Sequence, residues 1–410
     1  MEHLTAIIIG AGHAGLAMSR ALTQRSIEHV VLDRGQVGHA WRTARWDSLR
    51  MLTPNWANGL PGMPLHGVDP DGFMRASEFA DKLCTYARAV AVPLCSGVTV
   101  KRLTSMCGHY RVETDAGSLS AEVVINATGA ATLPRVPVLS QEVPRHILQI
   151  TPDRYRRPSD LPLGDVLIVG ASASGVQLAR ELQGSGRQVT LAVGGHVRLP
   201  RRYRGRDIEH WLDACGILDE RAEQIDDLTR ARHTPSPQLS GAGPVDLNAL
   251  QSLGVEVTGR VSAIRGGKAL FSGGLAHLTT LADLKMNRTL ERIDALAGTA
   301  PEPDTGAPPE RPEPTVLRTP PRLSRDLGGT LRTIVWATGH RPDHAWIDLP
   351  VLDARGRLRH EGGICPLPGL YLLGLPVLRR RRSHHISGAA ADTQDLAFLI
   401  ARHLDAMRAA

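Results

Sequence analysis

Two short apolar runs, each followed by a glycine-rich turn, are the clearest pattern in the chain. The runs cover residues 5–9 and 166–169, and runs of this kind are typical of strands buried on both faces of a parallel sheet. After the first run, the pattern predicts a helix over residues 14–24 and another buried strand over 30–32. We therefore expect a βαβ unit near the start of the chain and a second one that begins near residue 165.

The remaining apolar periodicity predicts further helices and strands. Apolar residues at helical spacing predict helices over 76–90, 282–296 and 393–409. Predicted strands cover 98–104, 109–114, 123–129, 331–339 and 370–373. Residues 299–322 are rich in proline and poor in apolar positions, which indicates a surface loop or a disordered segment.

The first glycine-rich turn covers residues 10–15 (GAGHAG), and its spacing is that of a dinucleotide-binding turn. Gly10 permits the tight turn, Gly12 lets the backbone approach a pyrophosphate, and Gly15 allows close packing of helix and strand. The N-terminus of the following helix presents unpaired N–H groups and a positive field to phosphate. Asp33 follows Gly10 by 23 residues, close to the spacing at which an acid binds a ribose diol. Together these features predict dinucleotide binding.

The second turn covers residues 170–175 (GASASG) and differs from the first at two points. Serine replaces the middle glycine, and its small side chain can donate a hydrogen bond to phosphate. No acid follows the next apolar strand before Asp207, whereas Arg198, Arg201 and Arg202 do. Because arginine can bind a 2′-phosphate in a fork, the pattern favours NADPH over NADH at this site. The alternative is that these arginines form a solvated loop or pair with the acids that follow them.

A strand that ends in Ala-Thr-Gly follows each glycine turn, at residues 127–129 and again at 337–339. The last predicted strand also ends in a glycine and would return to the first unit. We therefore predict an α/β fold with two Rossmann-like dinucleotide-binding domains, one inserted into the other. Residues 1–155 and 336–410 would form the outer domain, and residues 160–335 the inserted domain.

Composition and charge narrow the class of protein. Aromatic residues make up 4% of the chain, which argues against a nucleic-acid surface built on base stacking. The formal net charge of +7 favours anionic ligands, and a dinucleotide satisfies it as well as a nucleic acid would. No apolar run approaches the roughly 18–20 residues of a membrane span, and we see no signal peptide. We expect a soluble cytoplasmic protein without a nucleic-acid or membrane partner.

The cysteines and histidines do not indicate a metal or a redox disulfide. The five cysteines are scattered without CxxC or CxxxxC spacing, and we expect thiols in a reducing compartment. The arginine run at 379–382 is expected to form a surface loop, with a rim that attracts anionic ligands as the alternative. His384 and His385 follow this run and are expected at the surface rather than as an acid–base pair.

These features together resemble the flavin-containing monooxygenase superfamily, class B, whose members bind FAD and NADPH in one chain. Beyond the two turns, the resemblance rests on residues 38–42 (GHAWR), 46–54 (WDSLRMLTP) and 60–64 (LPGMP). It continues through the two strand-ATG segments to Leu373-Gly374 and covers nearly the whole chain. One stretch departs from the family, because Thr151 stands at the histidine of the fingerprint FxGxxxH, which disfavours a Baeyer–Villiger reaction.

The resemblance assigns residues to each cofactor, with Asp33 at the adenosine, Val100 at the adenine and Leu52 at the isoalloxazine ring. FAD would contact Gly10, Gly12, Gly15, Asp33, Arg34, Trp41, Arg42, Leu52, Val100, Thr128, Gly129 and Gly374. Together with the arginine argument, it places NADPH against Gly170, Ser172, Ser174, Gly175, Arg198, Arg201, Arg202, Thr338 and Gly339. The catalytic group is unknown, and the candidates near the flavin are Leu52, Thr53 and Asn55. No metal is expected.

The reaction implied by the resemblance starts with hydride transfer from NADPH to FAD. Reduced flavin would react with O2 to give a C4a-(hydro)peroxyflavin, which oxygenates a nitrogen or sulfur nucleophile of a small molecule, and with lower expectation a ketone. One alternative is an NAD(P)H oxidase or reductase without oxygen insertion, and another is a non-catalytic nucleotide-binding protein. The sequence names no substrate, and a homodimer is kept as one option for the assembly.

Overall fold

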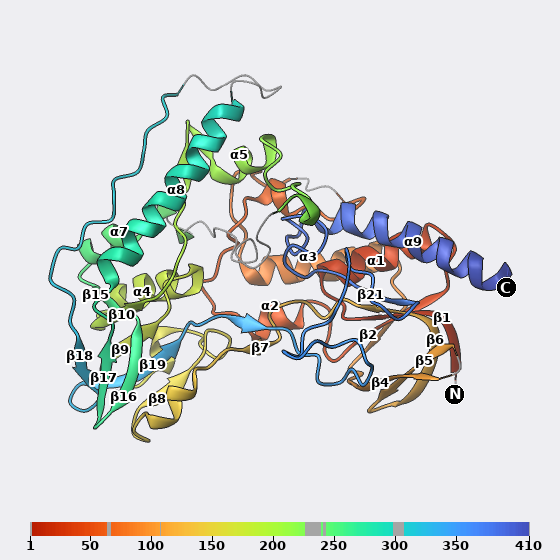
Figure 1. Cartoon of the computed structure of the whole chain (residues 1–410), viewed down its shortest axis with the longest axis horizontal. Coiled ribbons are helices and arrows are strands. Elements are labelled where there is room, and N and C mark those ends of the chain that lie inside the picture. Colours follow the sequence, from red (N-terminus) through yellow and green to blue (C-terminus); the bar gives the residue numbers. More distant parts are fainter. Residues whose placement is uncertain are drawn as a thin grey trace.

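The computed structural model describes residues 2–63, 67–106, 108–225, 239–240, 243–297 and 307–409. Two sheets lie in separate halves of the molecule, and the first strand and the last helix lie in the same half (Figure 1). The first sheet takes its strands from both ends of the chain, and the second takes them from the middle. This arrangement confirms the predicted α/β fold with one Rossmann-like domain inserted into another.

The first sheet has the strand order β3-β2-β1-β6-β5-β4, and β21 pairs with β6 outside this path. Its strands are β1 (Glu2–Ile9), β2 (His29–Asp33), β3 (Leu94–Ser96), β4 (Val100–Met106), β5 (His109–Thr114), β6 (Gly117–Asn126) and β21 (Leu370–Leu372). β4 and β5 form an antiparallel extension, and the other strands run parallel. The pairing of β21 with β6 brings the C-terminal segment back to the outer domain, as predicted for residues 370–373.

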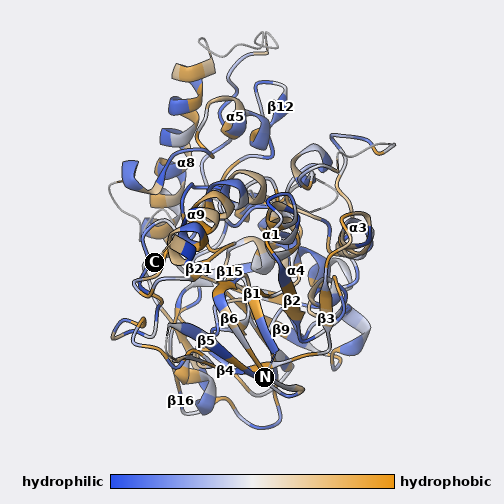
Figure 2. Ribbon diagram, turned by 90° about the vertical axis from the view of Figure 1, so that its right-hand side faces the viewer, coloured by the Kyte–Doolittle hydropathy of each residue, from blue (hydrophilic) through white to orange (hydrophobic). Residues whose placement is uncertain are grey.

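Helices α1 (His13–Thr23), α3 (Ala76–Ala89) and α9 (Ala389–Ala409) contribute to the core on one face of this sheet. Ile8 of β1 lies in that core, whereas its neighbour Ile7 lies in a second core with residues of the 347–378 segment. Successive side chains of a strand point to opposite faces, so the second half of β1, residues 6–9, is apolar and buried at every position. Figure 2 shows β1 with a hydrophobic part and a hydrophilic part.

The second sheet has the order β15-β10-β9-β19-β8, and all its strands run parallel. The strands are β8 (Leu148–Ile150), β9 (Asp165–Val169), β10 (Val189–Val193), β15 (Glu256–Gly259) and β19 (Leu331–Trp336). Helices α4 (Ala173–Gly184) and α7 (Leu247–Ser252) pack on it, and a separate core joins α5 (Ile208–Ala214) to α8 (Leu275–Ala297). β8 lies before the domain boundary predicted near residue 155, yet it pairs within this sheet.

Two chain crossings connect the halves of the molecule. β7 (Leu133–Pro134) pairs antiparallel with β20 (His340–Arg341), and both lie between the two sheets in Figure 1. The remaining strands are β11 (Arg202–Tyr203), β12 (Arg206–Asp207), β13 (Leu239–Ser240), β14 (Gly243–Pro244), β16 (Val261–Arg265), β17 (Lys268–Phe271) and β18 (Ser324–Asp326). The remaining helices are α2 (His39–Thr43) and the short 3-10 helices η1 (Asn55–Asn58), η2 (Val138–Glu142), η3 (Pro158–Asp160) and η4 (Ala222–Gln224).

Part of the proline-rich segment is ordered against the inserted domain. Residues 307–322 have no regular structure, but their backbone N–H groups bond to side chains of the domain surface. Thr315 donates to Asp283 over 2.7 Å, and Val316 donates to Asn248 over 2.9 Å. The surface-loop prediction therefore holds for this part, and residues 298–306 lie outside the described residues.

Two helices extend beyond their predicted starts. α8 begins at Leu275 rather than near residue 282, because Leu275 and Thr279 continue the buried stripe of the helix. α9 begins at Ala389 rather than near residue 393, because Ala389 and Asp392 are also buried. Thr279 and Asp392 are polar and Ala389 is small, so apolar periodicity alone did not reveal these helix starts.

Candidate dinucleotide sites

The first glycine turn is held by contacts that exclude larger side chains. Gly10 has φ +109°, and a Cβ there would lie 2.6 Å from the carbonyl oxygen of Ala127. A Cβ on Gly15 would collide with the carbonyl oxygen of Gly10, and it would lie 3.4 Å from the Cβ of Ala127. Nothing lies within 4 Å of a Cβ on Gly12, so this residue faces open space. The turn thus leaves room for a ligand at the position expected for a pyrophosphate.

The second turn repeats this geometry. Gly170 has φ +112°, and its Cβ would collide with the carbonyl oxygen of Ala337. A Cβ on Gly175 would collide with Gly170 and lie 3.5 Å from the Cβ of Ala337. The alanine of each Ala-Thr-Gly segment is therefore small because a glycine turn packs against it. Ser172 is exposed and is the N-cap of α4, and its side chain makes no capping hydrogen bond.

Asp33 distinguishes the first turn. Its carboxylate accepts the N–H of Ala11 over 2.6 Å and the N–H of Gly35 over 2.8 Å. Its backbone carbonyl accepts the N–H of Val98 over 3.0 Å, which holds the start of β4, at Val100, beside the end of β2. A carboxylate with two backbone donors still has lone pairs for a ribose diol. The geometry fits the predicted adenosine end of a dinucleotide.

Three histidines lie at the N-terminus of α1, where a pyrophosphate would bind. His13 lies in the turn itself, and His384 and His385 come from the C-terminal segment, with ring centroids 4.5 Å apart. Burial lowers the pKa of His13 to about 4, of His384 to about 4 and of His385 to about 3, with smaller charge effects among them. His13 Nε2 and His384 Nδ1 are buried without a hydrogen-bond partner. Unpaired buried polar atoms at this place fit a ligand with acceptor oxygens.

This histidine cluster corrects the expectation that His384 and His385 lie at the surface. The sequence shows two adjacent histidines but not that the C-terminal segment folds back over α1. Gly374 is part of that return, since a Cβ on it would lie 3.1 Å from the Cβ of Ala14. The histidine in the first glycine turn was the signal that could have pointed to the cluster.

The loop predicted to approach a flavin is braced by its own side chains. Asn55 is buried, donates to the carbonyl of Asp69 over 2.8 Å and accepts the N–H of Met74 over 3.0 Å. Thr53 donates to Asn58 over 2.6 Å. Both polar ends of the Asn55 amide are therefore committed to the loop. The structure gives Asn55 a bracing role in the loop, which uses one of its two N–H groups and one of its two acceptor positions.

Five other predicted contacts of the outer domain lie in different surroundings. Trp41 packs edge-on against Phe79 of α3, with ring centroids 4.9 Å apart. Arg42 pairs with Asp81 of the same helix over 2.6 Å, and Arg34 is exposed at the end of β2. Thr128 donates its N–H and hydroxyl to Asn126, and Gly129 follows with φ +78°.

The stretch 46–54 joins the two halves of the molecule. Trp46 is buried in the core of the second sheet, although its sequence neighbours belong to the outer domain. Ser48 donates to Glu181 of α4, and Tyr155 donates to the same carboxylate over 2.7 Å. This part of the family-like stretch thus has a structural purpose that spacing alone did not reveal.

Arg198 does not have the free guanidinium that was predicted to bind the phosphate of the second nucleotide. Its side chain is 4% exposed and pairs with Asp246 over 2.9 Å and with Asp283. It also donates to the carbonyl of Glu313 over 2.7 Å. A guanidinium with its donors committed to two carboxylates has no fork left for a 2′-phosphate.

Arg201 also lacks the exposed guanidinium expected of a ligand of the NADPH phosphate. It is 8% exposed, donates to the carbonyl of Leu52 over 2.8 Å and pairs with Asp207. Arg202 is exposed, and it donates to the carbonyl of Gly205 over 3.0 Å. Of the three predicted arginines, Arg202 is the one that the structure leaves at the surface.

The other predicted contacts of the second nucleotide differ in how free they are. Ser174 lies in the first turn of α4. Thr338 donates its hydroxyl to the carbonyl of Arg135, and the carbonyl of Gly339 accepts the N–H of Arg135 over 2.8 Å. The strand-ATG segment of the inserted domain therefore also anchors the connection between β7 and β20.

The arginine run at 379–382 forms ion pairs between the two domains, and the prediction of a surface loop was wrong. Arg381 pairs with Glu220, and Arg382 pairs with Asp213 and Asp219 of the inserted domain. The backbone adds to these contacts, since Arg382 donates to the carbonyl of Leu218 over 3.0 Å. Arg379 and Arg380 pair instead with Asp392 and Asp395 of α9, so acids of both domains balance the positive charge of the run.

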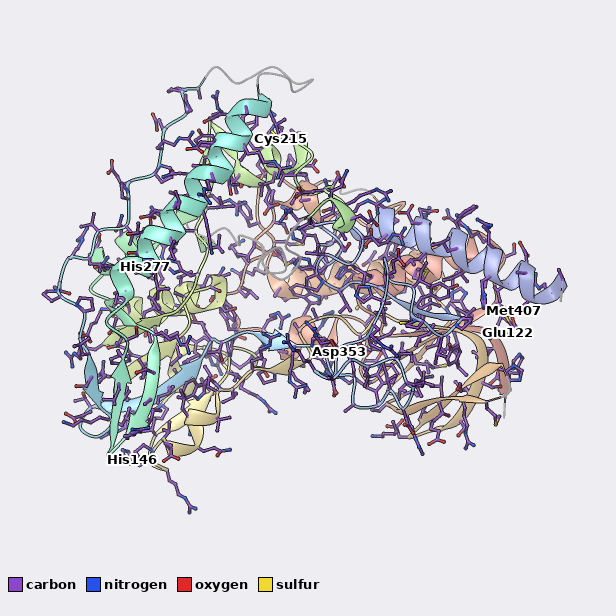
Figure 3. The ribbon with its side chains drawn as sticks, in the orientation of Figure 1. Glu122, His146, Cys215, His277, Asp353 and Met407 are labelled. Atoms are coloured by element: carbon purple, nitrogen blue, oxygen red, sulfur yellow. The ribbon has the colours of Figure 1, made fainter. Side chains whose placement is uncertain are left out.

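The described cysteines and charged groups give no metal or disulfide site. Cys84, Cys95, Cys215 and Cys365 are free thiols. Cys215 lies at the α5 end of the inserted domain, where Figure 3 labels it. Within the described ranges no group of three or more metal-ligating side chains converges. Among the same residues, no helix has both the length and the apolar character that a membrane span requires.

Two glycine turns of the same geometry lie on two sheets, and the β7–β20 pair connects these sheets. This arrangement is typical of oxidoreductases that bind two dinucleotides. Residues 7–215 match the model of the protein family described as "Pyridine nucleotide-disulphide oxidoreductase". The chain belongs to this family. A protein from Geobacillus kaustophilus named "Uncharacterized oxidoreductase CzcO-like" is 31% identical over 409 residues, which cover 98% of this chain and 100% of that protein.

Two further comparisons connect the chain to monooxygenases. Rice "Indole-3-pyruvate monooxygenase YUCCA1" is 29% identical over 205 residues, which cover 49% of this chain and 50% of that protein. The structure of a flavin-containing monooxygenase from Stenotrophomonas maltophilia has a TM-score of 0.70, at 17% identity, and covers 98% of this chain and 100% of that chain. The chain is a flavin-dependent oxidoreductase, and the resemblance to flavin monooxygenases is confirmed.

Proposed function

We propose that this protein is an NADPH-dependent flavin monooxygenase, with FAD in the outer domain and NADPH in the inserted domain. The observation that carries the proposal is the pair of matching turns that differ at one acid. Asp33 follows the first turn, and no acid follows β10 at the corresponding place. The family membership supports a pyridine nucleotide, and the relatives named as monooxygenases support oxygenation.

The residues of the chain would bind and orient the cofactors. Gly12 and the N-terminus of α1 would bind the FAD pyrophosphate, and Asp33 would accept hydrogen bonds from the adenosine ribose. Gly170 and Ser172 would do the same for the NADPH pyrophosphate at the N-terminus of α4. FAD, when bound, supplies hydride acceptance and the activation of O2, so the chain needs little acid–base chemistry of its own.

The packing between the domains would exclude water from the flavin. Trp46 from the outer domain is buried in the inserted core, and Arg381 forms an ion pair with Glu220 of the inserted domain. A nitrogen or sulfur nucleophile of a small molecule is the proposed substrate class. Thr151 at the position of the family histidine disfavours a ketone.

The test uses the purified holoprotein. We expect a flavin spectrum as isolated, and we expect NADPH to bleach it anaerobically faster than NADH does. On mixing with O2 and a panel of amines and thioethers, label from ¹⁸O2 should enter a product, and peroxide should account for less than the NADPH consumed. Bleaching without any label transfer and with one peroxide per NADPH would contradict oxygenation.

A second candidate is an NAD(P)H oxidase or reductase without oxygen insertion. The use of one Asn55 N–H and one Oδ1 lone pair within its own loop favours it, since this reduces the capacity of the amide to bond beside the flavin. The same experiment separates the two candidates. Failure of both NADPH and NADH to bleach the flavin would instead support a non-catalytic nucleotide-binding protein.

A further inference from the structure

One buried arginine connects the inserted domain to the loop predicted to face the flavin. Arg201 lies just before β11, and its guanidinium carbon lies 3.9 Å from the centroid of the Phe73 ring. It also donates to the carbonyl of Leu52 over 2.8 Å. Leu52 and Phe73 both belong to the outer domain. A single side chain thus contacts two points of that domain.

The buried charge of Arg201 is paired with a carboxylate, although its Nε has no hydrogen-bond partner. Asp207 pairs with the guanidinium, and the two side chains are 9% and 14% exposed. The same carboxylate accepts the N–H of Glu209 over 2.9 Å and caps α5. The backbone carbonyl of Arg201 accepts the N–H of Ile208 over 2.9 Å. The arginine is therefore fixed at its backbone, at its carboxylate partner and at its far end.

We propose that Arg201 is a positioning residue that sets the place of the Leu52 carbonyl and the Phe73 ring relative to the inserted domain. The inference rests on the proposed function, because that function places Leu52 beside the isoalloxazine ring. It replaces the sequence-based role of Arg201 as a ligand of the NADPH phosphate. The two roles predict different kinetic results, since a positioning residue affects the reaction rate and a phosphate ligand affects nucleotide affinity.

The experiment compares Arg201→Ala, Arg201→Lys and Asp207→Asn in the holoprotein. Asn keeps the cap of α5 but removes the ion pair, and Lys keeps the charge but lacks the planar fork. The control is Arg357→Ala, which breaks an exposed arginine–aspartate pair with Asp353, the residue labelled in Figure 3. The readouts are the absorbance and fluorescence of bound flavin, and the anaerobic bleaching rate against NADPH concentration.

We expect Arg201→Ala to shift the flavin spectrum and to lower the limiting bleaching rate about ten- to a hundredfold, as for a misplaced reacting group. The NADPH concentration for half-maximal rate should stay within about twofold, because Arg201 does not contact the nucleotide in our proposal. Asp207→Asn and Arg201→Lys should fall between Arg201→Ala and the unaltered protein. Arg357→Ala should leave both readouts unchanged.

Two results would overturn the proposal. One is an unchanged spectrum and limiting rate with a raised half-maximal NADPH concentration, which would restore the phosphate role. The other is that Asp207→Asn and Arg201→Lys have the same flavin spectrum and limiting rate as the unaltered protein. This second result is decisive even if Arg201→Ala does not fold. If NADPH fails to bleach the unaltered protein, the proposed function fails, and the spectra of the variants still test Arg201.

Discussion

Replacing Arg198 with alanine should destabilise the protein without changing its choice of nucleotide. The side chain is 4% exposed and lies between Asp283, which is 13% exposed, and Asp246, which is 29% exposed. The variant would leave two buried or half-buried carboxylates without their cation. Removing one partner of a buried pair typically costs about 3–5 kcal/mol.

The surroundings place the expected loss near the lower end of that range, at about 3 kcal/mol. Asp246 still accepts the N–H of Ala249 over 2.8 Å, and Asp283 still accepts the N–H of Thr315 over 2.7 Å. These bonds satisfy part of each carboxylate after the arginine is removed. A second substitution, Asp283→Asn, should recover part of the loss, because one fewer charge is then left buried.

The assay is urea unfolding of the holoprotein, followed by circular dichroism, with the ratio of NADPH to NADH turnover measured on the folded variant. The control is Arg157→Ala, since the Arg157 side chain is 64% exposed in its pair with Asp160 and should cost at most about 1 kcal/mol. A free energy of unfolding within about 1 kcal/mol of the unaltered protein, with a fall in the NADPH preference, would refute the reasoning.

Three further predictions follow from the sites. Arg202→Ala should raise the NADPH KM and leave the NADH KM unchanged, because a charged hydrogen bond worth roughly 1.5–3 kcal/mol is lost. An unchanged ratio of the two KM values in steady-state assays would exclude this contact. Gly15→Ala should yield protein without flavin colour, whereas Gly175→Ala should keep the colour but lose NADPH bleaching; the reverse pattern would contradict the assignment of the two turns. Burial lowers the pKa of His13 and His384 from 6.5 to about 4, so the unfolded state binds more protons between these values, and flavin-free protein should lose stability as pH falls from 6.5 towards 4. The loss should be at most roughly 1.4 kcal/mol per pH unit and histidine, and urea unfolding of His384→Gln should show a shallower dependence.

The elements and the two turns could be predicted because each is determined by neighbouring residues. The local spacing of the turn was enough to find Gly10 and Gly170, although the atoms that exclude a larger side chain there belong to Ala127 and Ala337, far along the chain. The buried strands were also readable, because a central strand of a parallel sheet needs apolar residues on both faces. The helix starts at Leu275 and Ala389 were missed because small and polar residues continue their buried stripes.

The roles of the arginines and histidines could not be predicted, because their partners are distant in the sequence. Arg198 meets an acid 85 residues away, and Arg381 meets one 161 residues away. A run of arginines has the same local pattern whether it faces solvent, phosphate or buried carboxylates. Only the folded chain shows which acids reach it.

The sequence by itself determined that two dinucleotide turns exist and that Asp33 distinguishes the first from the second. These properties can be read from residues within one βαβ unit, where spacing in sequence sets distance in space, even though Ala127 and Ala337 pack on the turns from elsewhere. The tertiary structure alone decided that Arg198, Arg201 and the 379–382 run hold the molecule together, and that His384 returns to the first turn. Those outcomes depend on how the inserted domain and the C-terminal segment pack against the outer domain, and packing over such separations is not encoded in any local pattern.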